Sequence, residues 1–313
     1  MGFKKTGGKW DKDRWPCYFA ASGLGWPTKV YKPLDQMLIA VNEIDGKLIE
    51  RFEVLLEQMP IFLDSGVFNL TNRHAERHGI SMDEALATDP EKIDGFGELF
   101  DKYVGLVKKY GHKLWGYIEL DQGGRENKIK TRGRLEKLGI VPIPVYHPFN
   151  DGWDYFDYLA ERYDRICFGN VVMADNDQRK RLIATAWERR RKYPHLWIHA
   201  LGLTPTELTV AFPINSCDSS TWAGPVRWGQ HRSFAATSSF GALGYEFVYE
   251  YGVKEGPNGY SKAVTLCSYD AFMINRQMRV IREDQESSLG CDVGMFDARS
   301  GKNKPADPRA GGG

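Results

Sequence analysis

The feature that most constrains the fold of this chain is an alternation of short apolar runs with longer, helix-like stretches. The apolar runs, in chain order, are CYFAAS, IFLDS, LWGYIELD, VPIPVYH, RICFGNV, LWIHALG and INSCDSS. Helical patterns are expected around residues 45–57, 125–138, 153–163, 177–192 and 204–211. Such alternation predicts an α/β fold in which parallel strands are joined by crossover helices.

Two α/β architectures fit this pattern, an open doubly wound sheet and a closed barrel. Neither GxGxxG nor GxxxxGK[ST], the phosphate-binding motifs that favour the open sheet, follows the early runs. We therefore predict a single (β/α)8 TIM-type barrel over residues 1–299, since 313 residues suit one large domain. Residues 300–313, SGKNKPADPRAGGG, are predicted to form a disordered tail.

Polar residues stand where the apolar runs end. In a (β/α)8 barrel the carboxyl ends of the strands form one ring, so residues far apart in the sequence would face a common pocket. The alternative is that these side chains only cap the helices that follow. The residues concerned are Asp64, Glu119, Asp121, His147, Asn170, His199, Gly202 and Asp218.

Charge and cysteine content exclude several classes of protein. Lys and Arg total 42 against 41 Asp and Glu, and 42% of residues are hydrophobic, which excludes a disordered or supercharged chain. The five cysteines are never closer than 24 positions, so neither a CxxC zinc motif nor a disulfide framework is present. We expect no cofactor and no metal site, although a structural metal at scattered Cys and His residues is left open.

The sequence also indicates the cellular compartment in which the protein is expected. No window approaches the roughly 18 to 20 uncharged apolar residues of a membrane helix, and the polar start MGFKKTGGKWDKDRW lacks the apolar core of a secretion signal. We therefore expect a cytoplasmic protein without a membrane partner.

Two aspartates that precede serine suggest a reaction. Asp64 ends an early strand and Asp218 a late one, and closure of a barrel brings such strands near one another. A pair of carboxylates about 5 Å apart suits chemistry at an anomeric carbon, where one attacks the sugar and the other handles the leaving-group proton. On this pattern alone, that chemistry is one option among many.

Five segments carry a resemblance to a known family. Asp64–Phe68 is similar to a DSGGF motif, Glu119–Asp121 to an FDE-type strand end, and Phe168–Val171 to a glycine-containing strand end that lies against a base. His199–Leu208 is similar to a YLMGxGTPEDL segment, and Asp218 follows it at the spacing of a nucleophilic aspartate. In this order the segments resemble the tRNA-guanine transglycosylase superfamily, and most closely its phage branch of DpdA-like 7-deazaguanine DNA modification proteins.

The resemblance implies a pentosyltransferase that replaces guanine in DNA by a free 7-deazaguanine of the preQ0 type, in the cytoplasm of the host cell if the protein is phage-encoded. Asp218 would attack C1′ to give a covalent glycosyl ester, and Asp64 would protonate the leaving guanine. Asp121 would accept hydrogen bonds from the purine, Gly169 would admit the ring close to the backbone, and Phe68 would stack on it. The other substrate-binding positions implied are Ser65, Gly66, His147, Asn170, His199 and Gly202.

The chain departs from the family pattern in three places. Val67 replaces the second glycine of DSGGF, and His147 stands about where the tRNA enzymes have a glutamine. The CxCxxC plus His zinc site of the tRNA enzymes is missing, which favours DNA over tRNA as the polymer. Whether protein partners are required is left open.

Nucleic-acid contacts are expected near the proposed nucleophile. Trp222, Arg227 and Arg232 are the candidates, with an ordinary core role as the alternative for the tryptophan. Two basic runs, 125–137 with six cationic side chains and 178–192 with seven, are either solvated helix faces or clamps for the phosphate backbone.

Three other functions fit parts of the same pattern. The first is the same exchange on tRNA, and the second is a barrel glycoside hydrolase that uses the two aspartates on a free sugar. The third is a binding subunit that has lost activity. The hydrolase should lack a purine-reading acid such as Asp121, and the inactive subunit should turn Asp64 or Asp218 away from the pocket.

Overall fold

The computed structural model describes residues 4–9, 18–21, 23–171, 174–193, 195–204, 214–224, 264–265, 267–276 and 278–280. Contacts between Cα atoms divide the chain into two compact units. Unit 1 comprises Met1–Trp10, Ala21–Thr28 and Gln36–Gly169, and unit 2 comprises Asp11–Ala20, Lys29–Asp35 and Asn170–Gly313. The expected tail, residues 300–313, lies outside the described residues.

The fold is α/β, as the alternation predicts. Among the described residues, the strand order within unit 1 is β4-β3-β2, with β6 beside β5, and within unit 2 it is β1-β8-β7. Every strand pair of known register is parallel. The strands are β1 (Tyr18–Ala21), β2 (Met37–Ala40), β3 (Ile61–Asp64), β4 (Gly116–Tyr117), β5 (Val145–Tyr146), β6 (Arg165–Phe168), β7 (Trp197–Ala200) and β8 (Ser216–Ser219).

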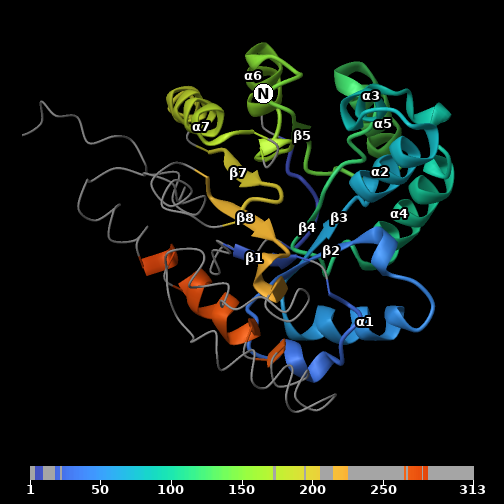
Figure 1. Cartoon of the computed structure of the whole chain (residues 1–313), viewed down its shortest axis with the longest axis vertical. Coiled ribbons are helices and arrows are strands. Elements are labelled where there is room, and N and C mark those ends of the chain that lie inside the picture. Colours follow the sequence, from blue (N-terminus) through green and yellow to red (C-terminus); the bar gives the residue numbers. More distant parts are fainter. Residues whose placement is uncertain are drawn as a thin grey trace, which may run out of the picture. The chain divides into compact units, whose positions relative to one another are not determined.

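Unit 1 contains β2 to β6 and most of the described helices (Figure 1). Its strands are short and largely buried; all four residues of β2 are buried and apolar. In Figure 1, α2, α3 and α4 lie beside one another. The helices are α1 (Leu48–Gln58), α2 (Val67–His78), α3 (Met82–Ala87), α4 (Phe96–Tyr110), α5 (Gly124–Lys137) and α6 (Trp153–Ala160), with short 3-10 turns η2 (Val41–Glu43) and η3 (Pro90–Lys92).

Within unit 1, an isolated bridge joins the segments next to β4 and β5. Ile118, just after β4, pairs in parallel with Ile143, just before β5. The Ile143 N–H donates to the Tyr117 carbonyl at 2.8 Å, and the Glu119 N–H donates to the Ile143 carbonyl at 3.0 Å. Unit 1 therefore runs through β2, β3, β4, β5 and β6 as neighbours in chain order.

Unit 2 contains most of β1, together with β7, β8, α7 (Asn176–Arg190) and the turn η5 (Thr221–Ala223). β1 pairs with β8 in parallel, with Phe19 opposite Asp218. Residues 267–276 are helical, and Asn275 among them accepts a hydrogen bond from the Tyr18 N–H at 3.0 Å. That bond fixes the first strand to the helix that follows much later in the chain.

The sequence located most of these elements. Each of the seven apolar runs contains one strand, and the helices expected near 45–57, 125–138, 153–163 and 177–192 correspond to α1, α5, α6 and α7. The expected helix at 204–211 falls almost wholly outside the described residues. Strand β2 and helices α2, α3 and α4 are not identified from the sequence. The 3-10 turn η1 spans Thr28–Tyr31.

Candidate functional site

The aspartate of the DSGGF-like segment lies at the end of β3. Asp64 ends the strand, and its Oδ2 accepts a hydrogen bond from the Gly66 N–H at 3.2 Å. Gly66 is left-handed, with φ of 78°, and a Cβ there would lie 1.9 Å from Asn42 Oδ1. Only glycine fits this turn, which begins helix α2 directly after the carboxylate. Ser65 is buried, and Phe68 on the first turn of α2 is exposed.

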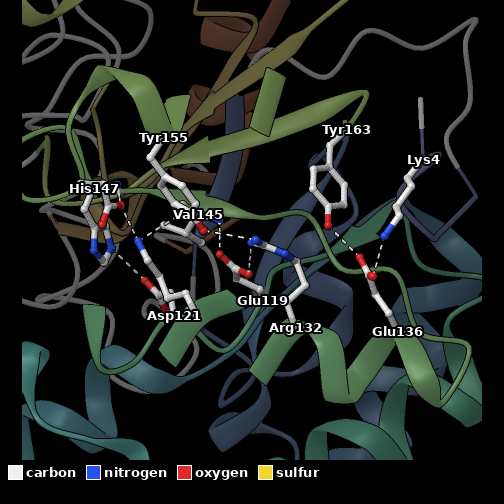
Figure 2. Close-up of polar contacts among 11 residues, drawn as sticks. Lys4, Glu119, Asp121, Arg132, Glu136, Val145, His147, Tyr155 and Tyr163 are labelled. Atoms are coloured by element: carbon white, nitrogen blue, oxygen red, sulfur yellow. Dashed lines mark hydrogen bonds and ion pairs between the residues drawn. The ribbon is translucent and has the colours of Figure 1, made fainter. Parts of the chain in front are cut away.

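A second acid in unit 1 pairs with a histidine. Asp121, after β4, has its Oδ2 3.0 Å from Nε2 of His147, after β5 (Figure 2). Since an ionised carboxylate only accepts hydrogen bonds, Nε2 must carry the proton that it donates to Asp121. The side chains of Asp121 and His147 are 16% and 7% exposed. Two positions named from separate segments of the sequence therefore form one polar pair.

The backbone of His147 is fixed by a buried ion pair. Its N–H donates to Asp151 Oδ2 at 2.7 Å, and Lys128 of α5 donates to the same oxygen at 2.5 Å. Lys128 also donates to the Val145 carbonyl at 3.1 Å. Both members of this ion pair are almost fully buried. The turn that carries His147 is thus held from its backbone as well as from its ring.

The ring of His147 lies against Gly169 at the end of β6. A Cβ added at Gly169 would meet His147 Cδ2 at 2.5 Å and Nε2 at 2.6 Å. The family resemblance assigns this glycine to close approach of a purine. In unit 1 the group that approaches it is an imidazole of the same chain, so the need for glycine here is explained by His147.

Glu119, in the FDE-like segment, is buried and is held by contacts that stabilise the fold of unit 1. Its carboxylate accepts hydrogen bonds from Arg132 Nη1 at 2.7 Å and from the Val145 N–H at 2.6 Å (Figure 2). Arg132 also donates to the Tyr155 hydroxyl at 3.1 Å. Burial by itself lowers the pKa of Arg132, but Glu119, Tyr155 and Tyr163 together outweigh burial and raise that pKa, so the guanidinium stays charged. The pair links the segment after β4 to α5.

In unit 2, the proposed nucleophile belongs to a buried cluster. Asp218 Oδ1 lies 3.1 Å from His199 Nε2 and accepts the Gly202 N–H at 3.0 Å. His199 Nδ1 lies 2.8 Å from Ser216 Oγ, and Trp197 Nε1 donates to that same Oγ at 2.9 Å. β7 and β8 carry four of these residues, and Gly202 follows β7.

Ser216 links two other members of this cluster. The indole N–H of Trp197 is a donor only, so the Ser216 oxygen accepts it, and the same hydroxyl forms a hydrogen bond with His199 Nδ1. His199 Nε2 then donates to Asp218. This chain of hydrogen bonds fixes the orientation of the His199 ring and of the Asp218 carboxylate.

The remaining candidate positions have the following environments. Asn170 has a positive φ of 60°, which is uncommon outside glycine. Trp222 is fully buried, with its ring 6.5 Å from that of Tyr31, so the described structure gives it a core role and no nucleic-acid role is assigned. Arg227 and Arg232 lie outside the described residues.

Three residues of the site are missed by the sequence patterns. Asp151, Lys128 and Ser216 fix the proposed functional side chains, but none of them ends an apolar run. Lys128 lies in a run that is charged along its whole length, so no pattern marks it as buried. The alternation within β8 is the one available signal for Ser216, since residues 216 and 218 of a strand face the same side.

No family model matches the chain, and no curated protein matches it at a significant level. Among the described residues, no helix is long and apolar enough to cross a membrane.

Proposed function

We propose that the protein is a transglycosylase that replaces guanine in DNA by a 7-deazaguanine base through a covalent aspartyl intermediate. The observation that carries the proposal is the cluster in unit 2, where His199, Gly202 and Asp218 are joined by hydrogen bonds. The sequence selects these three residues from two separate segments by their likeness to one family. Their meeting around one carboxylate supports that likeness.

The carboxylate of Asp218 suits nucleophilic attack. Both hydrogen bonds described for it fall on Oδ1, and its side chain keeps 7% exposure. A carboxylate held at one oxygen keeps the other for attack on C1′, and burial removes the water shell that would shield it. His199 is a positioning residue in this scheme, since it acts on the sugar only through Asp218.

The pair in unit 1 suits recognition of a purine edge. His147 holds Asp121 through Oδ2, which leaves Oδ1 as an acceptor for a ring N–H or an exocyclic amine. A site built to bond such donors discriminates against bases that lack them, because its largely desolvated acceptor would then be unpaired. A hydrolase acting on a free sugar has no need for such a purine-reading acid.

In the proposed reaction Asp64 is the general acid and base, which is the role that the family resemblance gives it. Asp64 would then protonate the departing guanine and later accept a proton from the incoming base. Two displacements at C1′ give net retention.

The polymer and the reaction are tested together in cells that make preQ0. We expect DNA from cells expressing the chain to contain a modified deoxynucleoside, detected by mass spectrometry after digestion, and tRNA to contain none. Asp218→Ala should abolish the signal. Asp177→Asn, at an exposed carboxylate of α7, is the matched control and should leave it unchanged. Modification confined to tRNA would establish the tRNA alternative, and no modification in either polymer would contradict the proposal.

Asp64→Asn separates the acid from the nucleophile. The amide keeps the shape of the side chain but cannot exchange a proton, so we expect DNA binding to persist while base exchange stops. Binding is measured by fluorescence anisotropy with a labelled duplex, and exchange by incorporation of labelled guanine. Turnover at the wild-type rate would remove Asp64 from the mechanism.

A further inference from the structure

Three potential metal ligands gather away from the strand ends of unit 1. His74 and His78 lie on α2, and Asp94 lies in the segment between η3 and α4. Each offers one ligand atom, and these atoms lie within 4.8 Å of one another. It is the only group of this kind among the described residues.

The geometry of α2 and of the segment before α4 brings the three together. His74 and His78 are four positions apart, so they share a helix face, and their ring centroids are 4.3 Å apart. His78 Nε2 lies 3.7 Å from Asp94 Oδ2. The next residue, Gly95, is left-handed, with a φ of 82°, and precedes α4. An ion pair with Arg77 of α2 holds Asp94 beside the helix.

The buried member of the group has an unsatisfied ring nitrogen. His74 is only 8% exposed, and its buried Nδ1 has no hydrogen-bond partner among the described residues. Buried polar atoms are nearly always paired, because an unpaired one costs about 1–3 kcal/mol. A cation bound through Nδ1 would give this atom the polar partner that it lacks among the described residues.

We propose that His74, His78 and Asp94 bind a divalent cation of the zinc class. Two imidazoles and a carboxylate are donors that zinc accepts, and water would complete four-coordination. Donors on one tetrahedral zinc ion lie about 3.4 Å apart for bonds of about 2.1 Å, so the group must close by roughly 1 Å. His78 and Asp94 are about half exposed, so both are able to rotate.

The site would be structural. His74 is seven positions beyond Val67, where α2 begins, which is on the order of 10 Å along the helix axis. A cation there would tie the C-terminal half of α2 to the segment that leads into α4. This inference does not depend on the proposed transglycosylase activity.

Arg77 contacts one of the proposed ligands, so a substitution of Arg77 should change metal affinity in the direction opposite to a substitution of a ligand. Its Nη1 donates to Asp94 Oδ2 at 2.6 Å. A cation at the site would compete with this guanidinium for the carboxylate and be repelled by its charge. Removal of Arg77 should therefore strengthen metal binding, whereas removal of a ligand should weaken it.

The experiment uses the full chain without a histidine tag, freed of metal by chelation and dialysis. We expect it to bind one Co²⁺ per chain with the visible absorption of a low-symmetry site, and Zn²⁺ to displace the cobalt. His78→Ala and Asp94→Asn, both at exposed positions, should weaken binding on the order of tenfold or more. Arg77→Gln should tighten it several-fold, and His112→Ala, at an exposed histidine elsewhere, should leave it unchanged.

His74→Gln is compared with the wild type by circular dichroism, so that misfolding at this buried position is recognised. The variants at the two exposed ligands, His78 and Asp94, decide the outcome, because substitutions at exposed positions should leave the fold intact. Absence of a cobalt spectrum in the wild-type chain would overturn the proposal, as would equal affinity in the wild type, His78→Ala and Asp94→Asn. Tighter binding in Arg77→Gln would support it, because loss of a purely structural ion pair does not create metal affinity.

Discussion

At the scale of single residues, Gly169 shows how one sequence signal fits two physical causes. A glycine at the end of a strand indicates that some group approaches the backbone closely, and the sequence attributes that group to a purine. In unit 1 the His147 ring takes this space, with Nε2 only 2.6 Å from where a Cβ would stand. The glycine therefore positions the Asp121–His147 pair, whatever ligand that pair binds.

Gly169→Ala should destabilise the protein through this contact. A Cβ at 2.5 Å from His147 Cδ2 is far inside van der Waals contact, so the imidazole must move and its bond to Asp121 breaks. Overpacking of this kind costs about 1–3 kcal/mol in the free energy of unfolding, measured by urea denaturation.

The double variant His147→Ala, Gly169→Ala provides the control. With the ring removed, the added methyl group has space, so the alanine at 169 should cost clearly less than in the wild type. If the two substitutions are simply additive, the contact with His147 is not what requires glycine at this position.

Patterns in the sequence identify the side chains at the strand ends, but not the residues that hold these side chains in place. Asp121, His147, His199 and Asp218 can be selected because each ends an apolar run, a signal that is local in the sequence. The residues that hold these side chains in place can be identified only from the folded structure. Asp151 binds the His147 backbone, yet in the sequence it is one of many polar residues in a turn.

At the scale of elements, helix α5 buries charged side chains that its sequence predicts to be exposed. The run 125–137 contains six cationic side chains, which predict a solvated face or a phosphate clamp. Lys128 and Arg132 instead point inward, paired with Asp151 and Glu119. Spaced four apart, they lie on one helix face, which packs on the strand ends. The helix is thus fixed by ion pairs where an apolar stripe is usual.

Arg132→Met should therefore be strongly destabilising. It leaves the Glu119 carboxylate buried without its counter-ion, and breaking a buried pair in this way costs about 3–5 kcal/mol in the free energy of unfolding. Urea denaturation followed by tryptophan fluorescence measures the change. Lys130→Met, at an exposed position of the same helix, should stay within about 0.5 kcal/mol of the wild type.

A second substitution shows whether the unpaired charge is the cause. Glu119→Gln in the Arg132→Met background removes the charge but still accepts the Val145 N–H. It should recover a large part of the lost stability. No recovery would mean that the loss comes from packing of the arginine stem.

The elements that can be predicted are those with a concentrated apolar signal. Strands buried on both faces give short apolar runs, and α1 places Phe52, Leu55 and Leu56 on one buried face. Helix α2 gives no such signal, because its buried positions include Thr71 and His74. Burial of polar side chains is decided by their neighbours, and a single sequence does not show those neighbours.

At the scale of the whole molecule, the ionised carboxylates make stability depend on pH. Hydrogen bonds from partners lower the pKa of Glu84 beside Ser81, of Asp94 beside Arg77 and of Asp154 beside Arg125. A carboxylate whose pKa is lower in the folded state stabilises it above the unfolded pKa of about 4, and this contribution is lost as pH falls through the folded value.

We therefore expect the urea midpoint to stay level between about pH 7 and pH 5 and to fall below about pH 4. These three groups are exposed, so the acid-induced loss should shrink in about 0.5 M salt, which screens surface pairs. A midpoint that stays constant down to about pH 3 would contradict this account.

The net charge of +1 gives no general attraction to a polyanion, so binding of DNA must depend on where the cations lie. The two basic runs differ in this respect. In α5, Lys128 and Arg132 are committed to buried partners. In the run that includes α7, Lys180, Arg181, Arg191 and Lys192 are exposed. The second run is therefore the better candidate for phosphate contacts in unit 2.

Salt dependence of DNA binding tests this difference. Each phosphate contact contributes about −0.9 to the slope of log K against log salt concentration, so Lys180→Gln with Arg181→Gln should reduce the slope by about 2 if both bind phosphates. The exposed cations of α5 supply the comparison, and Lys130→Gln with Lys137→Gln should change the slope less. An equal effect of the two double variants would indicate that only the total charge attracts DNA. A larger effect of the α5 variant would assign the phosphate contacts to unit 1, because the cations of that helix would then carry the binding in spite of their two buried members.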